Sequence, residues 1–238
     1  MIVRAGWPER TIRVNGYRVR VRRQTPDEQF VTTQLVWSEY TPPGFEVRPT
    51  DTVIDIGGNI GTFTLHASRC ASKGRVFTFE PEGENFRLLT RNLALNRCRN
   101  VMAVQAAVAG TSGTVRLRLA GAGGFHSVVR DRAGTHGDVP VEAVSLADIF
   151  DRHEIQRCNF LKMDCEGAEY EILYAATPEL MRQIDKIAME YHGSSDQADR
   201  RRESDRLAAH LEDCGFSIVA YEESIGFRGG FIRAMRHN

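Results

Sequence analysis

Apolar residues alternate with arginines over residues 11–23 (TIRVNGYRVRVRR), on both sides of the dipeptide Asn15-Gly16. A period of two is typical of a strand with one buried face, and Asn-Gly favours the positive φ angles of a type I′ turn. The pattern therefore predicts a β-hairpin with one apolar and one basic face. The side chains predicted to pack inward are Tyr17, Val19 and Val21, and those predicted to face solvent are Arg18, Arg20 and Arg22.

Beyond the hairpin, short apolar segments rich in β-branched residues alternate with segments of helical periodicity. This alternation is typical of βαβ units and a parallel sheet. The predicted strands are 52–57, 75–80, 101–110, 159–164 and 186–192, and the predicted helices are 27–40, 60–72, 82–97, one from about 167, and 196–214.

Two regions depart from this alternation. Residues 113–144 predict short antiparallel strands around a mobile, glycine-rich loop at 121–127. Near the C-terminus, 216–224 and 227–235 predict two strands, and their short connection suits antiparallel pairing.

Composition and charge narrow the class of protein. The chain is 42% hydrophobic and 26% charged, as in ordinary globular proteins, and its 31 basic and 31 acidic residues cancel. A neutral chain argues against nonspecific binding of nucleic acid, which needs a basic surface. Residues 1–23 alone carry seven arginines and one acid, so a patch for RNA or another anion stays an alternative to a solvated strand face.

The organisation of the chain predicts one domain over 1–238, with a hairpin and lid in 1–48 and a ligand-binding core in 49–238. No repeat or linker divides it, and its five cysteines form no CxxC pair, which argues against a disulfide framework or a structural zinc. The chain has neither a signal-peptide pattern nor a long apolar run. We therefore expect a cytoplasmic protein without a membrane partner.

A glycine-rich turn follows the strand predicted at 52–57 and leads into a helix, with the sequence Gly57-Gly58-Asn59-Ile60-Gly61. This geometry brings a nucleotide-like ligand against the backbone. The glycines do not fit the GxGxxG spacing of dinucleotide-binding proteins, and no lysine follows them as in a phosphate-binding P-loop. Both of those ligand classes are therefore disfavoured.

Acidic residues mark the ends of two successive strands. Asp55 stands directly before the glycines, and Glu80 ends the next strand 25 residues later. A carboxylate at the second position accepts hydrogen bonds from two ribose hydroxyls. An acid at the turn would repel a pyrophosphate but suits a ligand with an ammonium group and no phosphate, such as S-adenosylmethionine.

Five segments resemble the FkbM family of S-adenosylmethionine-dependent methyltransferases, in order and in spacing, over roughly residues 50–192. They are VIDIGGNIGTFTLHAS, FEPEGENFRLLTRNLALN, AAVAG, FLKMDCEGAEYEIL and IAMEYH. The family usually has Ala at the position of Gly58 and a small aliphatic residue at that of Cys165. The hairpin and the extreme C-terminus lie outside the resemblance.

The resemblance implies an α/β fold of the class I methyltransferase (Rossmann-like) type. Its sheet would have seven strands, mostly parallel with the last strand antiparallel, and the N-terminal β-hairpin would be an addition to it. The resemblance also implies an O-methyltransferase that acts on a small-molecule hydroxyl acceptor, often a natural product or a sugar.

Expected site residues follow from the strand ends and from the fold. The expected cofactor-binding residues are Asp55, Gly57, Asn59, Gly61, Glu80 and Asp164, with Ala107 bordering the adenine as the fold implies. The expected catalytic residues are His192 as general base, Asp164 and Glu190 beside it, and His126 as a secondary candidate base.

Several side chains keep two interpretations. Glu166 and Glu169 suit the start of a helix, where carboxylates are favoured by the helix dipole, or a functional role. Trp37 and Tyr40, in a predicted lid at 34–45, would close over the cofactor, with core packing as the alternative for Trp37.

Alternatives also remain for the chemistry. Asp164, Glu190 and His192 would suit Mg²⁺, but no spacing such as DD or HxxxE supports a metal, so the predicted site is metal-free. An RNA or protein methyltransferase that uses the basic hairpin is the main functional alternative. A dehydrogenase and a nonenzymatic module are weaker ones. A homodimer paired through the hairpin is a further hypothesis.

Overall fold

The structure is a computed structural model that describes residues 8–118, 127–129, 138–194, 196–223 and 229–236. Its centre is a sheet of seven strands in the order β12-β13-β11-β10-β3-β4-β5. Six of these strands run in the same direction, while β13 runs antiparallel to both of its neighbours, β11 and β12. The strands are β3 (Thr52–Ile56), β4 (Arg75–Phe79), β5 (Val101–Val104), β10 (Phe160–Met163), β11 (Lys186–His192), β12 (Ser217–Glu223) and β13 (Gly229–Met235). This arrangement confirms the predicted fold class.

The segment predicted as one strand at 101–110 is divided between two sheets, which corrects that prediction. β5 ends at Val104, and β6 (Ala107–Ala109) pairs instead with a strand of a second, four-stranded sheet. The backbone turns between them, where the amide of Ala106 donates to the carbonyl of Val104. The remaining strands of the second sheet are β7 (Gly113–Arg118), β8 (Ser127–Val129) and β9 (Asp138–Ser145). Strand β7 pairs antiparallel with β8 and with β9, as predicted.

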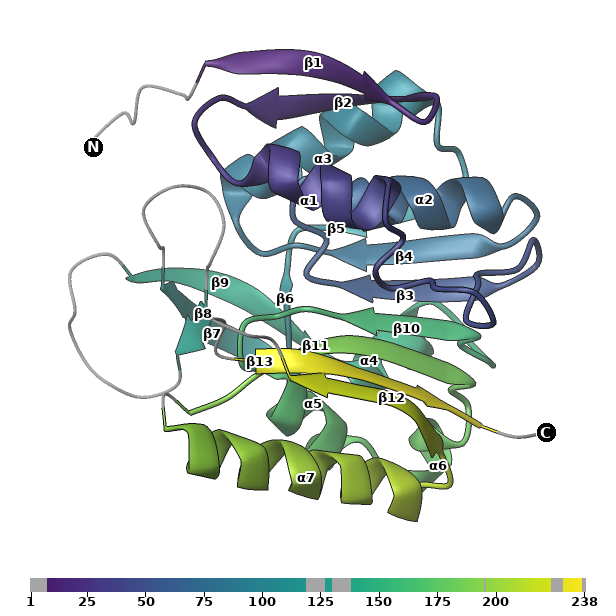
Figure 1. Ribbon diagram of the computed structural model, residues 1–238, viewed down its shortest axis with the longest axis vertical. Helices are drawn as coiled ribbons and strands as arrows, with labels where there is room; N and C mark the ends of the chain where they lie inside the picture. The colour runs from purple at the N-terminus through teal and green to yellow at the C-terminus, as the bar shows by residue number, and fades with distance from the viewer. Residues whose placement is uncertain (1–7, 119–126, 130–137, 195, 224–228, 237–238) are drawn as a thin grey trace.

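Helices cover both faces of the central sheet (Figure 1). On one side lie α1 (Asp27–Leu35), α2 (Thr62–Cys70) and α3 (Gly83–Asn96), and on the other lie α5 (Glu169–Ala175), α6 (Pro178–Met181) and α7 (Gln197–Asp213). The short helix α4 (Leu146–Arg152) follows β9. Because both faces are covered, the central strands β3 and β10 are almost entirely buried, and their sequences are mostly apolar rather than alternating, with Asp55 and Lys162 as the charged exceptions.

Helix α1 ends five residues before the predicted limit at 40. The amides of Val36 and Trp37 both donate to the carbonyl of Thr32, and Ser38 adopts a left-handed φ of 53° that ends the helix. Trp37 is 70% exposed, so the core-packing interpretation of this side chain is wrong. Tyr40, by contrast, is buried beneath the segment.

The hairpin forms as predicted, with β1 (Glu9–Val14) and β2 (Tyr17–Arg22) joined by Asn15-Gly16, both at positive φ. Its apolar side chains pack on α1, α2 and α3. Two predicted exposed arginines, Arg18 and Arg20, remain at the surface, but the third, Arg22, is buried and corrects the prediction. The reason is an ion pair with Asp27 at the start of α1.

The Arg22–Asp27 pair joins the hairpin to the first helix through three contacts. Arg22 Nη2 lies 2.8 Å from Asp27 Oδ1, and its Nε and backbone amide donate to Asp27 Oδ2 at 3.0 and 2.8 Å. The side chains are only 3% and 0% exposed. A buried charge without its partner is strongly destabilising, so the hairpin cannot leave α1 without a large free-energy cost.

Within the described residues, no helix combines the length and the apolar composition that crossing a lipid bilayer requires.

Replacing Asp27 with Asn should lower the free energy of unfolding by ~3–5 kcal/mol, because the guanidinium of Arg22 loses its buried counter-charge. Glu28→Gln is the matched control, since the neighbouring Glu28 pairs with Arg10 at the surface, where both side chains are 45% exposed. That change should cost below ~1 kcal/mol. Chemical denaturation of both variants measures the difference, and equal losses would contradict the role assigned to the buried pair.

Candidate functional site

The glycine turn between β3 and α2 is packed against the end of β10. Gly57 and Gly61 adopt left-handed φ angles of 76° and 88°, and the amides of Gly57 and Gly58 both donate to the carbonyl of Phe79 at 3.0 Å. A Cβ on Gly57 would lie 1.8 Å from the carbonyl oxygen of Asp164. Only glycine therefore allows this approach, which brings the turn and residue 164 together.

A buried lysine, Lys162, binds the backbone of the turn. Lys162, on β10, points its Nζ at the carbonyl oxygens of Gly57 (2.7 Å) and Ile56 (3.2 Å). The same ammonium lies 3.3 Å from Asp55 Oδ1 and 3.8 Å from Asp164 Oδ2. Burial disfavours its charge, but the two carboxylates outweigh this effect and raise the pKa of Lys162. The lysine is therefore a charged link between the glycine turn and two acidic residues.

Asp55 is fully buried near the end of β3, directly before the glycine turn. Its Oδ2 accepts hydrogen bonds from Thr64 (2.6 Å) and Thr78 (3.1 Å), and the residue has no exposed surface. The hydroxyl of Thr78 also fills the space that a Cβ on Gly58 would need, at 2.3 Å. The structure thus places Asp55 where it supports the turn through Lys162, and a direct contact of Asp55 with a cofactor stays a prediction.

Glu80 forms a buried acceptor niche at the end of β4. Its Oε2 accepts from the amide of Asn59 at 2.9 Å and its Oε1 from the amide of Glu82 at 2.8 Å. Burial raises the pKa of Glu80 to about 7. The side-chain oxygens of Asn59 and Asn85 are also buried, and neither has a hydrogen-bond partner among the described residues. A niche with several acceptors and few donors suits a ligand that brings hydroxyl groups.

Ala107 begins β6 just beyond the carboxyl end of β5, so it lies at the same edge of the sheet as the Glu80 niche. It is buried, in the second sheet rather than in the strand where it was predicted.

Acidic side chains gather at the carboxyl ends of β10 and β11. The hydroxyl of Tyr40 donates to Asp164 Oδ2 at 3.0 Å and lies 3.5 Å from Glu190 Oε2. Burial and the charge of Asp164 raise the pKa of Glu190 to about 8. The carboxyl groups at this edge are therefore either negatively charged or protonated. In both forms they favour a positively charged ligand, which can displace a bound proton.

His192 lies at the same edge, between two further carboxylates. Its Nδ1 contacts Glu169 Oε1 at 3.0 Å, and its Nε2 lies 3.5 Å from Glu166 Oε2 and 3.9 Å from Glu190 Oε1. Burial disfavours the imidazolium, but the hydrogen bond and charge of Glu169 outweigh it and raise the pKa of His192 to about 10. Burial raises the pKa of Glu166 to about 7, partly opposed by His192. At neutral pH the histidine is therefore protonated.

Glu169 fixes the orientation of this histidine. It is fully buried, and besides His192 it accepts hydrogen bonds from the amides of Cys165 and Gly167, both at 2.9 Å. With Nδ1 held by Glu169, Nε2 is the nitrogen that lies toward Glu166 and Glu190. This is the arrangement by which a carboxylate orients a catalytic histidine.

The ligand atoms of Asp164, Glu166 and His192 lie within 4.8 Å of one another, so these three residues could hold a divalent cation. The set differs from the predicted one, because Glu166 replaces Glu190. A metal would bind Nε2 and displace the proton that the imidazolium carries there, while the Nδ1 proton would stay with Glu169. The arrangement therefore fits a proton-transfer role at least as well as a metal role.

A cavity of about 730 Å³ opens beside Glu166 and His192, between α5 and the start of α7. Tyr170 and Tyr174 form an aromatic wall, and the buried hydroxyl of Tyr170 has no hydrogen-bond partner among the described residues. The volume suits a small-molecule ligand. The other lining residues are Gly167, Gly193, Ser194, Glu203 and Arg206.

The structure brings most of the predicted site residues to one edge of the sheet, although whether they act as predicted stays a prediction. Among the predicted site residues, only His126 lies outside the described part of the chain. The sequence analysis missed Lys162 and left Glu169 between a helix-start role and a functional role. A signal for Lys162 existed, because it is one of three lysines in the chain and stands inside an otherwise apolar strand.

Comparison with known proteins agrees with the fold. The profile of the "Methyltransferase FkbM domain" matches residues 55–218. The hexuronic acid methyltransferase AglP of Haloferax volcanii is 30% identical over 156 residues, which is 65% of this chain and 61% of the relative. The 31-O-demethyl-FK506 methyltransferase FkbM of Streptomyces tacrolimicus is 25% identical over 215 residues, covering 78% and 80% of the two chains. The chain thus spans less than two thirds of the Haloferax relative.

Solved structures of low sequence identity share the fold. The fibrillarin pre-rRNA processing protein of Methanococcus jannaschii aligns with a TM-score of 0.55 at 12% identity, over 99% of this chain and 86% of that one. TYW2 of P. horikoshii, solved in complex with MeSAdo, aligns with a TM-score of 0.52 at 14% identity, over 95% and 70%. Since the family profile spans more than half of the sequence, and includes the glycine turn, the Glu80 niche and the His192 cluster, the chain belongs to the FkbM methyltransferase family.

Proposed function

We propose that the protein transfers a methyl group from S-adenosylmethionine to a hydroxyl oxygen of a small molecule, a sugar or a natural-product intermediate. The observation that carries the proposal is the Glu169-oriented His192, which stands between the glycine turn and a cavity large enough for such an acceptor. Membership of the FkbM family supports the reaction class.

The residues around the glycine turn fit the cofactor. The buried acceptors of Glu80, Asn59 and Asn85 suit the two ribose hydroxyls, and Gly57 and Gly61 let the backbone approach the ligand closely. Asp164 provides negative charge for its ammonium or sulfonium group, and Glu190 adds to this charge when it loses its proton, since its pKa is raised to about 8. When bound, S-adenosylmethionine supplies an activated methyl group on a positively charged sulfur.

His192 is the general base in this proposal. Its Nε2 takes the proton of the acceptor hydroxyl, while Glu169 holds Nδ1 and stabilises the imidazolium that forms. In the free protein, the raised pKa means that His192 already carries a proton at neutral pH. The free protein must therefore lose that proton before it can act, which makes the reaction faster as the pH rises.

The cavity next to His192 is the proposed acceptor site. Tyr170 and Tyr174 offer aromatic surface to an apolar or sugar-ring face, and Arg206 and Glu203 offer polar partners for hydroxyl or carboxylate groups. The relatives named above act on a hexuronic acid and on a demethylated FK506, so both acceptor types are suitable probes.

The test of this function is product formation. The protein is incubated with S-adenosylmethionine and either glucuronic acid or 31-O-demethyl-FK506, in EDTA and in Mg²⁺, and products are identified by mass spectrometry and NMR. We expect a methyl ether, formed equally in EDTA. Methylation at nitrogen, transfer only to RNA or protein, or complete dependence on Mg²⁺ would each contradict the proposal as stated.

Glu80→Gln should weaken the binding of S-adenosylhomocysteine ~10–100-fold, because a neutral amide replaces a charged acceptor of ribose hydroxyls. Glu84→Gln is the matched control on the same helix start, since Glu84 is exposed and pairs with Arg87. Isothermal titration calorimetry at pH 8, above the raised pKa of Glu80, measures both affinities. Equal affinity of the two variants would remove Glu80 from the cofactor site.

Glu169→Gln should lower the pKa of His192 by ~1–3 pH units, because the imidazolium loses its nearest buried counter-charge. Histidine ring NMR measures this value directly, from about 10 in the wild type. Glu203→Gln is the control, since Glu203 lines the cavity and accepts from the amide of Ser194 instead.

The same variant separates orientation from catalysis. The rise of kcat/KM with pH should move to lower pH in Glu169→Gln, with a lower plateau, and His192→Ala should abolish that rise while the affinity for S-adenosylhomocysteine stays unchanged. An unmoved pH profile in Glu169→Gln would show that His192 is not the base.

A further inference from the structure

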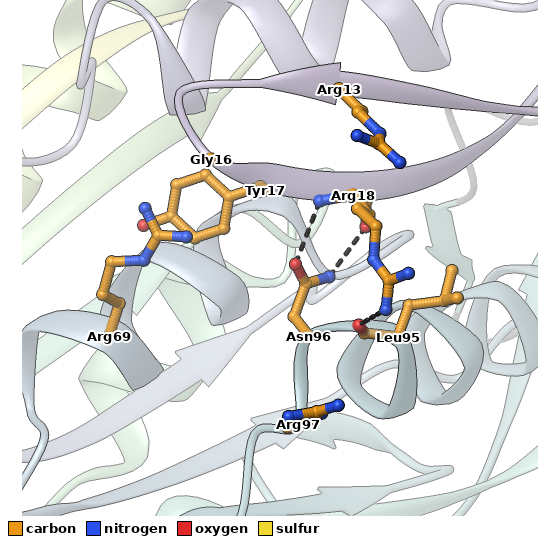
Figure 2. Close-up of a pocket in the computed structure, with 8 residues that line it drawn as sticks. All are labelled: Arg13, Gly16, Tyr17, Arg18, Arg69, Leu95, Asn96 and Arg97. Atoms are coloured by element: carbon orange, nitrogen blue, oxygen red, sulfur yellow. Dashed lines mark hydrogen bonds between the residues drawn. The ribbon is translucent and has the colours of Figure 1, made fainter.

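A second cavity lies at the opposite edge of the sheet from His192. It is enclosed by the turn of the β1–β2 hairpin and by the C-terminal ends of α2 and α3, and its volume is about 370 Å³ (Figure 2). Its lining contains four arginines and no acidic residue. The lining residues are Arg13, Gly16, Tyr17, Arg18, Arg69, Leu95, Asn96 and Arg97.

The arginines of this cavity differ from the other arginines of the hairpin in their charge balance. Arg10 and Arg20 are paired with Glu28 and Glu9, and Arg22 is paired with Asp27. Within the described part of the chain, none of the four cavity arginines forms an ion pair with an acid. Their positive charges are therefore concentrated in one place without compensation.

Two of these guanidinium groups are held in position by the protein. Arg69 stacks 3.4 Å above the ring of Tyr17 and donates from Nη1 to the carbonyl of Asn15 at 2.9 Å. Arg18 donates from Nη2 to the carbonyl of Leu95 at 2.6 Å. Each guanidinium has five N–H donors, so most of them remain available to a ligand. Donors fixed in this way lose little entropy when they bind an anion.

Arg13 and Arg97 complete the cavity from opposite sides. Arg13 lies on β1, on the same side of the cavity as Arg18. Arg97 is the C-cap residue that directly follows α3 (Figure 2). Neither side chain has a described hydrogen bond or ion pair within the protein. They are therefore the two cavity arginines whose removal leaves the packing of the hairpin on α3 intact.

We propose that this cavity binds the diphosphate group of a small phosphorylated molecule, such as a nucleoside diphosphate. Guanidinium groups bind phosphate oxygens in a bidentate manner, and a diphosphate brings enough negative charge to neutralise most of four arginines. The volume admits such a group but not a large ligand.

The adjoining surface favours a small anion over a nucleic acid strand. A neighbouring cavity of about 480 Å³ shares Arg18 with the first one and adds Arg20 and Arg91, but both of these are already paired with Glu9. Glu9 also pairs with Arg87, so the positive charge beyond Arg18 is partly, not fully, compensated. A nucleic acid backbone needs a longer basic track.

The bound diphosphate would be neither the cofactor nor the methyl acceptor. Helix α3 begins beside the Glu80 niche and ends at Arg97, and its 14 residues place the cavity ~20 Å from the niche. The cavity is thus a separate ligand site on the far edge of the same domain, and its occupancy can be measured without any methyl transfer.

The test is isothermal titration calorimetry of the full chain with inorganic diphosphate and with ADP. Arg13→Gln/Arg97→Gln should weaken both ~10-fold or more, because two charge-assisted contacts are lost. The matched control is Arg10→Gln/Arg91→Gln, which removes the same net charge from arginines that are exposed and already paired. It should bind within about twofold of the wild type.

Several outcomes would overturn the proposal. Absence of binding to the wild type, or an equal loss in the two double variants with unchanged melting temperatures, would show that the cavity is not a diphosphate site. A short single-stranded RNA that binds while inorganic diphosphate does not would assign the surface to nucleic acid instead. Binding of inorganic diphosphate but not of ADP would support a diphosphate site in this cavity and would restrict its ligand to free diphosphate.

Discussion

The ammonium group of Lys162 is the contact on which the geometry of the site depends. It is buried at the centre of the sheet, and it reaches two carbonyl oxygens of the glycine turn and the carboxylates of Asp55 and Asp164. Burying a charge of this kind is favourable only when its partners are in place. The turn, β3 and the end of β10 are therefore positioned together, and the close approach of Gly57 to Asp164 follows from that arrangement.

Acidic and basic side chains are concentrated at opposite edges of the domain, although the chain as a whole is neutral. Carboxylates surround His192 at the carboxyl ends of β10 and β11, while uncompensated arginines surround the hairpin turn at the other edge. The two fields favour ligands of opposite sign. A net charge of zero therefore gives no indication of how strongly each edge of this protein selects its ligand.

The order of strands and helices could be predicted from the sequence because periodicity reports burial, and burial is what the sheet requires of β3, β4, β10 and β11. The break at residues 105–106 could not, since both halves of that segment are apolar and only pairing with β9 distinguishes them. Likewise, the burial of Arg22 depends on Asp27, and local alternation contains no information about that partner.

The site was predictable to the extent that strand ends converge. Asp164, Glu190 and His192 end adjacent strands, and they lie together as expected from that topology. The roles of Glu169 and Lys162 could not be deduced in the same way. A helix-start acid and a lysine within a strand acquire their function only from distant neighbours, here His192 and the carbonyls of residues 56 and 57.

The two halves of the site have walls from different parts of the chain. The niche around Glu80 is built from the turn and the start of α3, whereas the cavity beside His192 is built from α5, the end of β11 and α7. Substitutions at Tyr170, Tyr174 or Arg206 can therefore reshape one wall without disturbing the other. If the cavity holds the acceptor as proposed, this separation provides a physical route to divergence: a few changes in the cavity lining would change which molecule fits there, while the costly buried charges around the glycine turn stay unchanged.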